Sequence, residues 1–189
     1  MTGNQRKTFL QLTFGAPDKL ALPFWKASPG EWTFKYGNSI EDLDLDEKTL
    51  KTDLVYLKMA EIWGTNSHCK RMQVGCLMVK NKSIISDGYN GSPSGFPNQC
   101  EDDSNTTLPY VLHAEANAIT KLARSSESGE NAVAFITHQP CLECSKLLYQ
   151  TGISEVYYVH EYRVKEGVEF LTKCKIKLHR MKDEYFIKL

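Results

Sequence analysis

The hydrophobic positions change their period along the chain, and each change predicts a different element. Between residues 46 and 63 the apolar residues recur at helical spacing, which predicts one amphipathic helix. Its apolar face is formed by Leu50, Leu54, Val55, Leu57, Met59 and Ile62. Two short apolar runs follow at residues 74–79 and 83–89, and the short polar turn at 80–82 between them predicts a β-hairpin.

Beyond the hairpin, helical and strand patterns alternate almost to the end of the chain. Helices are expected from near residue 113, from residue 140 to about 152 and over residues 165–172, and strands at 132–137, 155–159 and 175–179. Because a helix joins the last two strands, these strands should run parallel. The pattern therefore predicts an α/β protein with three layers, α/β/α, around a five-stranded mixed sheet.

The first fifty residues differ in composition from residues 51–189. They are rich in aromatic residues without helical or strand periodicity, and prolines and glycines interrupt them. The aromatic residues are Phe9, Phe14, Phe24, Trp25, Trp32, Phe34 and Tyr36. Disordered segments are poor in aromatics, so we interpret residues 1–50 as an extension that packs on the core or on a neighbouring subunit.

Charge and hydropathy narrow the classes of partner. The 23 basic residues equal the 23 acidic residues, and this balance argues against long nucleic acid as the main partner. A small anionic ligand needs only a few local cations or a helix N-terminus. No apolar run approaches the length of a membrane span, and the first residues lack the apolar core of a signal peptide. We therefore expect a cytoplasmic protein without a membrane partner.

The six cysteines are expected to be thiols or metal ligands, because the chain has no secretion signal. Cys76 and Cys174 fall in strand patterns and are expected to be small buried apolar residues. Cys69 and Cys100 fall in loops, and together with His68 they would offer three donors to a second metal ion.

The remaining two cysteines belong to the main chemical motif of the chain. His113 and Glu115 lie two residues apart, and Pro140 precedes Cys141 and Cys144 at the start of a helix. The helix dipole favours thiolates in the first turn, and three protein ligands leave the fourth position of a zinc ion to water. Side chains two apart on a helix point about 200° away from each other. A common centre must therefore lie off the helix end, where we expect two helix N-termini to converge on one zinc ion.

The motif has two competing interpretations. A Cys-x-x-Cys pair alone is typical of redox proteins, and a structural zinc ion would take a fourth ligand such as His138 or Cys100. We favour a catalytic site because the upstream His113 and Glu115 complete it. Two thiolates neutralise the charge of zinc, so Glu115 is expected to share the proton of the bound water. His138 is then expected to be a hydrogen-bonding residue or part of the pocket wall.

A histidine, a glutamate two residues later and a downstream Pro-Cys-x-x-Cys form the signature of zinc-dependent nucleobase deaminases. Over residues 50–180 the chain resembles the cytidine deaminase superfamily and, within it, the deoxycytidylate (dCMP) deaminases, above all the virus-encoded ones. The likeness rests on residues 69–75, 88–95, 112–118, 140–144 and 161–163. The Gly-Tyr-Asn-Gly sequence at 88–91 is the most discriminating segment, because tRNA adenosine deaminases lack it.

The resemblance implies hydrolytic deamination of dCMP to dUMP and ammonia, with one zinc ion in each subunit. Zinc-bound hydroxide would attack C4 of cytosine, and Glu115 would carry the proton of the water to N3 and then to ammonia. Asn90 would contact the sugar, and Tyr162 and Arg163 would contact the 5′-phosphate or the pocket edge. Further substrate contacts are expected from Ala114, His138, Gln139 and Pro140. Relatives often carry serine where this chain has Gln139. The main-chain carbonyl of Gln139 is still able to accept a hydrogen bond from the amino group of the substrate.

The resemblance also implies a homohexamer that dCTP activates and dTTP inhibits at a subunit interface, with Mg²⁺ accompanying the triphosphate. The expected effector residues are Lys70, Arg71, Gly88, Tyr89, Asn90 and Gly91. A virus-encoded enzyme would work in the host cytoplasm. The alternatives are a deaminase of another base, such as modified dCMP, free cytidine or tRNA adenosine, and a non-catalytic zinc module that binds nucleotides. The presence of Glu115 argues against the last of these.

Overall fold

The computed structural model describes residues 47–181, with side chains from residue 51 onward. The extension expected at residues 1–50 therefore lies outside the described residues, apart from 47–50, which form the first turn of a helix. The elements are α2 (Glu47–Gly64), β1 (Gly75–Lys80), β2 (Ser83–Tyr89), α3 (Ala114–Leu122), β3 (Val133–His138), α4 (Leu142–Gln150), β4 (Glu155–His160), α5 (Glu166–Lys173) and β5 (Lys177–Arg180). Every helix and strand expected after residue 46 is present, with ends shifted by a few residues.

The five strands form one mixed sheet in the order β2-β1-β3-β4-β5. Strand β1 is antiparallel to both β2 and β3, whereas β3, β4 and β5 are parallel. The two residues between β1 and β2, Asn81 and Lys82, both have positive φ angles, of 50° and 63°. Such a turn matches the right-handed twist of a hairpin. The structure confirms the predicted hairpin and the parallel arrangement of the last two strands.

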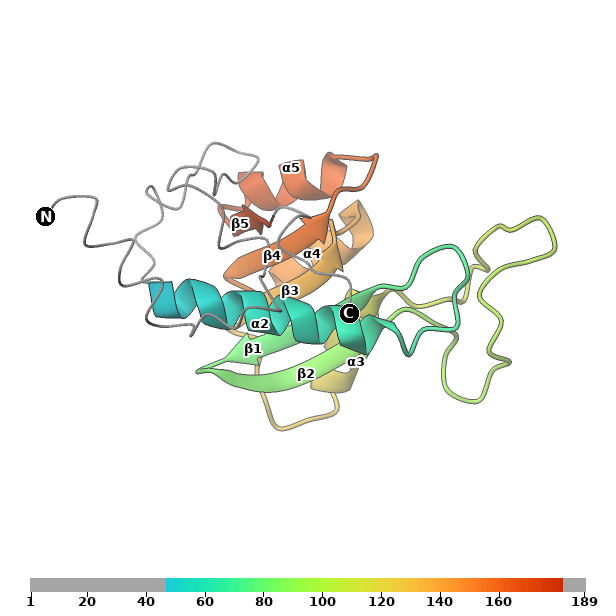
Figure 1. Ribbon diagram of the computed structural model, residues 1–189, viewed down its shortest axis with the longest axis horizontal. Coiled ribbons are helices and arrows are strands. Elements are labelled where there is room, and N and C mark those ends of the chain that lie inside the picture. Colours follow the sequence, from blue (N-terminus) through green and yellow to red (C-terminus); the bar gives the residue numbers. More distant parts are fainter. Residues whose placement is uncertain (1–46, 182–189) are drawn as a thin grey trace, which may run out of the picture.

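Alternation along the strands divides the core between the two faces of the sheet. In β1, Cys76 and Met78 point to the face that packs against α3, α4 and α5, while Leu77 and Val79 point to the face covered by α2. Figure 1 shows α2 crossing one face of the sheet with α3 and α4 behind it. The predicted three-layer α/β/α fold is therefore confirmed. Among residues 47–181, no helix combines the length and apolar character that a membrane span needs.

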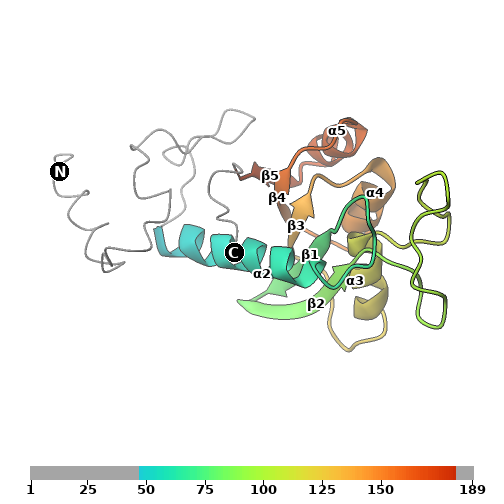
Figure 2. The same ribbon diagram turned by 45° about the vertical axis from the view of Figure 1, so that its right-hand side comes forward.

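The carboxyl ends of β3 and β4 lie side by side at one edge of the sheet. His138 is paired with His160 in the parallel register, and the main-chain N–H of Gln139 donates to the carbonyl of His160 at 2.8 Å. Helix α4 begins directly after this edge. The long loop between β2 and α3 extends away from the sheet in both views (Figures 1 and 2). In open α/β sheets, ligands bind outside the carboxyl ends of the strands.

The structure corrects the interpretation of three cysteines. Cys69 and Cys100 form a disulfide, with Cα atoms 5.1 Å apart, so they are neither thiols nor ligands of a second metal ion with His68. The absence of a secretion signal carried no information about how close these two loops lie, and a disulfide requires that closeness. Cys174 is the C-cap of α5 and only half-buried, because β5 begins three residues later than its position. Cys76 is fully buried, as expected.

Packing of β2 against α3 depends on Gly88. A Cβ atom at this position would lie 2.6 Å from the amide nitrogen of Ala118 and still closer to the carbonyl oxygen of Ala114. Both atoms belong to the backbone of α3, so they cannot move without distorting the helix. At Gly91 a Cβ atom would have Tyr89 as its nearest neighbour, at 4.0 Å.

This difference predicts that Gly88→Ala destabilises the fold while Gly91→Ala does not. Forcing β2 away from α3 should cost about 3 kcal/mol, which corresponds to a fall of about 6–12 °C in the melting temperature. Gly91→Ala, the matched control, should change the free energy of unfolding by less than about 0.5 kcal/mol. Thermal and urea denaturation of both variants would measure this. Equal melting temperatures for the two variants would contradict the close packing at Gly88.

Candidate metal centre and active site

The two segments of the main motif meet at the starts of two helices. His113 is the N-cap of α3 and Cys141 is the N-cap of α4, and both have extended backbone conformations, with φ/ψ of −71°/157° and −73°/169°. His113 therefore precedes the helix that contains Glu115. The separation of about 200° expected for two residues on one helix does not arise, because only one of them is helical.

His113, Cys141 and Cys144 bring three metal-binding atoms together, all within 4.8 Å of one another. The Nδ1 atom of His113 lies 3.5 Å from the sulfur of Cys141 and 3.4 Å from that of Cys144. Tetrahedral coordination with ordinary Zn–N and Zn–S bond lengths places nitrogen and sulfur ligands about 3.6 Å apart. The observed spacing thus fits a zinc ion with three protein ligands.

The two thiols have opposite acidities in the absence of a metal ion. Hydrogen bonding to Cys144 and to the His113 ring lowers the pKa of Cys141 to about 4, although partial burial opposes this. The same contact with Cys141, together with burial and the nearby Glu115 carboxylate, raises the pKa of Cys144 far above its ordinary value. Only one thiolate is therefore stable without a cation. A zinc ion bound here would supply the positive charge that holds both sulfurs as thiolates.

Glu115 lies in the first turn of α3 and is buried. Burial raises the pKa of its carboxyl group, while the neighbouring His113 and a hydrogen bond with Cys144 lower it to a smaller extent. These contacts place the carboxylate beside the three metal-binding side chains. A carboxyl group with a raised pKa is suited to accepting a proton and returning it.

The alternative of a structural zinc ion with four protein ligands does not fit this geometry. Neither proposed fourth ligand joins the group: Cys100 is in the disulfide, and Nδ1 of His138 forms a hydrogen bond with Thr137 Oγ1 at 2.9 Å. Within residues 51–181, the group of metal-binding side chains contains three members. Three ligands from these described residues would leave the fourth position of a zinc ion open to water, as in catalytic sites.

Asn90 braces the loop between α2 and β1. Its Oδ1 accepts the main-chain N–H of Val74 and its Nδ2 donates to the carbonyl of Met72, both at 2.8 Å. Its own carbonyl accepts the hydroxyl of Ser67 at 2.7 Å. One amide hydrogen and one lone pair of the side chain remain for a ligand such as a sugar hydroxyl.

The remaining residues expected to contact substrate lie at the carboxyl edge of the sheet or next to it. The ring of His138 lies 4.7 Å from that of His160, and Gln139 and Pro140 are buried. Ala114 is fully buried under Gly88, so it can contribute only main-chain atoms to a ligand. Tyr162 and Arg163 lie in the loop after β4.

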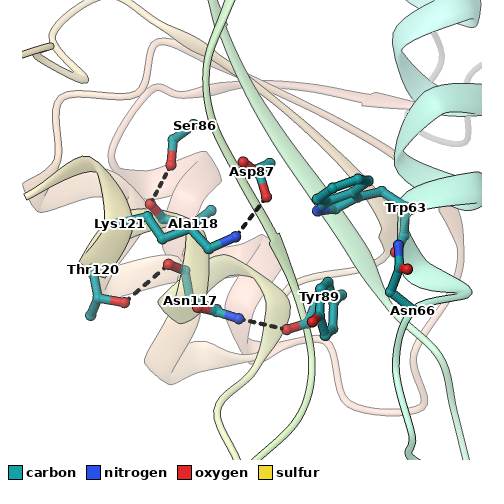
Figure 3. Close-up of polar contacts among 9 residues, drawn as sticks. All are labelled: Trp63, Asn66, Ser86, Asp87, Tyr89, Asn117, Ala118, Thr120 and Lys121. Carbon is teal, nitrogen blue, oxygen red and sulfur yellow. Dashed lines mark hydrogen bonds and ion pairs between the residues drawn. The ribbon is translucent and has the colours of Figure 1, made fainter. Parts of the chain in front are cut away.

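Figure 3 shows how α3 holds the end of β2, where the expected effector residue Tyr89 lies. Asn117 of α3 donates to the carbonyl of Tyr89 at 3.0 Å, and Lys121 pairs with Asp87 at 2.6 Å. The Lys121 ammonium lies 5.9 Å from the Tyr89 ring centroid, and the Trp63 ring packs edge-on against Tyr89. Trp63 and Lys121 were not expected at this place, since only the fold brings α2 and α3 to opposite sides of β2.

The expected effector residues separate into two groups. Gly88 and Gly91 have structural contacts, because Gly88 packs under α3 and Gly91 exchanges two main-chain hydrogen bonds with Leu112 at 2.9 and 3.0 Å. Lys70 and Arg71 have exposed side chains, while their main-chain N–H groups bind the buried carboxylate of Glu101 at 3.2 Å.

Glu101 was missed by sequence reasoning. An acid directly after the cysteine of a loop gave no signal of burial.

Residues 50–160 match the family model described as cytidine and deoxycytidylate deaminase zinc-binding region. A deoxycytidylate deaminase of Saccharomyces cerevisiae is 37% identical over 123 residues, which cover 60% of this chain and 39% of the yeast protein. The deoxycytidylate deaminase of Mycobacterium phage D29 is 32% identical over 58% of this chain and 94% of its own length.

A solved structure extends the similarity to three dimensions. The crystal structure of dCMP deaminase from the cyanophage S-TIM5, in complex with dCMP and dUMP, is 43% identical with a TM-score of 0.68. The match covers 72% of this chain and 99% of the cyanophage chain. The present chain spans only 39%, 59% and 48% of three curated relatives from yeasts and Bacillus subtilis. The family match over more than half of the chain, together with this structure, shows that the chain belongs to the cytidine and deoxycytidylate deaminase family.

Proposed function

We propose that the protein deaminates dCMP by hydrolysis, giving dUMP and ammonia. The observation that carries the proposal is the meeting of His113, Cys141 and Cys144 at two helix starts, with the buried carboxylate of Glu115 beside them. The cyanophage relative, whose complex contains dCMP and dUMP, supports the choice of substrate.

In the proposed reaction, His113, Cys141 and Cys144 would hold one zinc ion, which when bound would activate the water that adds to C4 of cytosine. Glu115 takes a proton from this water and delivers it to N3 of the ring. It then takes the remaining water proton from the C4 hydroxyl and gives it to the amino group. The C4–N bond breaks as the C4 carbonyl forms, so that one water is consumed and one ammonia is released. Burial of Glu115 suits this role, because the raised pKa makes the protonated form accessible.

The carboxyl edge of the sheet would bind the remainder of the nucleotide. The main-chain carbonyl of Gln139 is the proposed acceptor for the amino group, with Ala114, His138 and Pro140 around the base. The free amide hydrogen of Asn90 is the proposed donor to the sugar. Arg163 and Tyr162 are proposed to contact the 5′-phosphate, to which a guanidinium group can donate two parallel hydrogen bonds.

We further propose a homohexamer with an effector site for dCTP and dTTP, with Mg²⁺ bound to the triphosphate. The exposed side chains of Lys70 and Arg71 offer positive charge to the phosphates. Tyr89, which directly precedes Asn90 in the sequence, offers an aromatic ring. Arg71 donates to the neutral hydroxyl of Thr107 at 3.1 Å. This contact therefore leaves the positive charge of Arg71 unneutralised.

The zinc site predicts a difference between two cysteine variants. Cys144→Ser should reduce bound zinc from about one ion per chain to a small fraction, because one of three ligands is lost. Cys174→Ser, which changes a half-buried cysteine at the end of α5, should keep the full amount. Elemental analysis of the purified proteins measures the metal directly. Full zinc occupancy in Cys144→Ser would show that the ligand set is wrong.

The proposed activity predicts a rise in dUMP when the zinc-loaded protein is incubated with dCMP. Deoxycytidine, CMP and dCTP, assayed in parallel by ultraviolet absorbance, test whether another cytosine compound is preferred. Glu115→Gln should lower kcat at least about 1,000-fold with zinc retained, because the proton carrier is lost. Glu143→Gln removes an exposed carboxylate of α4 and serves as the control. The proposal fails if no cytosine nucleotide is turned over by the zinc-loaded protein.

The effector site predicts that dTTP shifts the dCMP saturation curve to higher concentrations and that dCTP reverses the shift. A variant with both Lys70→Ala and Arg71→Ala should lose this response while keeping its activity without effectors. Lys82→Ala, in the β1–β2 turn, removes an exposed charge elsewhere and should respond normally. A saturation curve of the unmodified protein that is indifferent to both nucleotides would contradict the effector site.

A further inference from the structure

Gln139 connects the end of β3 to the loop that follows β4. Its side chain is only 4% exposed. Its main-chain N–H donates to the carbonyl of His160 at 2.8 Å, and its side-chain Nε2 donates to the carbonyl of Val164 at 2.7 Å. The side chain therefore extends from the residue before Pro140 toward the 161–165 loop.

The orientation of the Gln139 amide follows from its partner. Because the Val164 carbonyl accepts but cannot donate, the nitrogen of the amide must face it. The oxygen, Oε1, is buried and has no hydrogen-bond partner among the residues that the structure describes. A buried amide with one group unpaired adds little stability, so the Val164 contact matters mainly for the segment that it holds in place.

The segment from Glu161 to Gly167 is seated against the start of α4. A Cβ atom at Gly167 would lie 2.8 Å from Ser145 Oγ and even closer to the carbonyl oxygen of Pro140. The close approach of α5 to α4 thus fixes one end of the segment. At the other end it leaves β4, and the Gln139 amide holds the middle through Val164.

The charges of this segment leave one cation available. Glu161 pairs with Lys165 at 2.9 Å and with Arg180 at 3.6 Å, so two of the three neighbouring cations have a carboxylate partner. Arg163 forms no ion pair with a carboxylate of residues 51–181, and its guanidinium carbon lies 5.9 Å from the centroid of the Tyr162 ring. Its side chain is exposed and able to receive an anion.

We propose that Gln139 is a positioning residue that, through the carbonyl of Val164, sets Arg163 for binding the 5′-phosphate of the substrate. The inference rests on the proposed function, since it requires a nucleotide with its base at the metal centre. Gln139 lies two residues before the ligand Cys141, and Val164 adjoins Arg163, so one side chain links the metal site to the phosphate site. A serine at position 139 would be too short to reach Val164.

The first test compares Gln139→Met with the unmodified protein. Methionine keeps the length of the side chain but cannot donate to Val164. KM for dCMP should rise about 10-fold with kcat changed less than about 2-fold, because binding of the phosphate is weakened equally in the ground state and the transition state. Turnover of deoxycytidine, which has no phosphate, and zinc content should be unchanged. Gln99→Met removes a bond of the same kind, from Gln99 Nε2 to the carbonyl of Glu101 at 2.9 Å in the long loop after β2, and as the matched control should leave KM unchanged.

The second test is a double-mutant cycle with Arg163→Gln. If Gln139 acts through Arg163, Gln139→Met should not raise KM further in the Arg163→Gln background. Effects that multiply, or a loss of deoxycytidine turnover equal to that of dCMP, would overturn the inference. Gln139→Asn, which remains polar but is one methylene shorter, should behave like Gln139→Met and replaces it if methionine disturbs folding.

Binding measurements separate the failure of this inference from the failure of the proposed function. An unmodified protein that does not deaminate dCMP sinks the proposed function. Calorimetry with dUMP and deoxyuridine then still tests the role of Gln139. The preference for dUMP over deoxyuridine should fall about 10-fold in Gln139→Met, and an unchanged preference would overturn the role.

Discussion

The structure depends on the meeting of two helix starts around three metal-binding atoms. His113 and Cys141 occupy equivalent N-cap positions, one on each helix, and the Cys144 sulfur completes the group. Without a cation this arrangement is electrostatically unfavourable, since Cys141 ionises easily while Cys144 does not. Close packing at two glycines, where a side chain would collide with backbone atoms, seats each helix start: Gly88 of β2 packs against α3, and Gly167 of α5 packs against the start of α4. The fold thus forms a site that lacks positive charge and that a bound cation would stabilise.

Rigid connections around the metal group come from loops that are fastened to one another. The disulfide of Cys69 and Cys100 joins the loop before β1 to the long loop after β2, and the Glu101 carboxylate binds two main-chain N–H groups beside it. Asn90 adds hydrogen bonds on both sides of Gln73, a residue of the same loop. Loops that are proposed to contact a ligand need such fastening, because a misplacement of about 1 Å can cost a large factor in rate.

Most of the fold was predictable from the sequence because binary patterning determines which side of the sheet each strand residue faces. The alternation of Cys76, Leu77, Met78 and Val79 alone identifies two packed faces. Long-range contacts were not predictable in the same way. The Cys69–Cys100 pairing and the burial of Glu101 depend on loop paths, and the direction of the Gln139 side chain depends on where β4 ends. The metal-binding residues could be named in advance because zinc chemistry restricts both residue type and spacing.

The proposed role of Gln139 would give a physical reason for a nucleotide substrate to be distinguished from a nucleoside. A phosphate contact made by a freely moving arginine contributes less to binding, because ordering the side chain consumes part of the interaction energy. Anchoring the carbonyl of Val164 reduces that entropic loss before the substrate arrives. The Gln139 side chain starts beside the metal-binding group and reaches the loop after β4. In the proposed complex, this side chain and the ends of β3 and β4 would set the distance between the base and the phosphate. In this proposal, preference for a substrate with a 5′-phosphate follows from a side chain that lies two residues before the metal-binding Cys141.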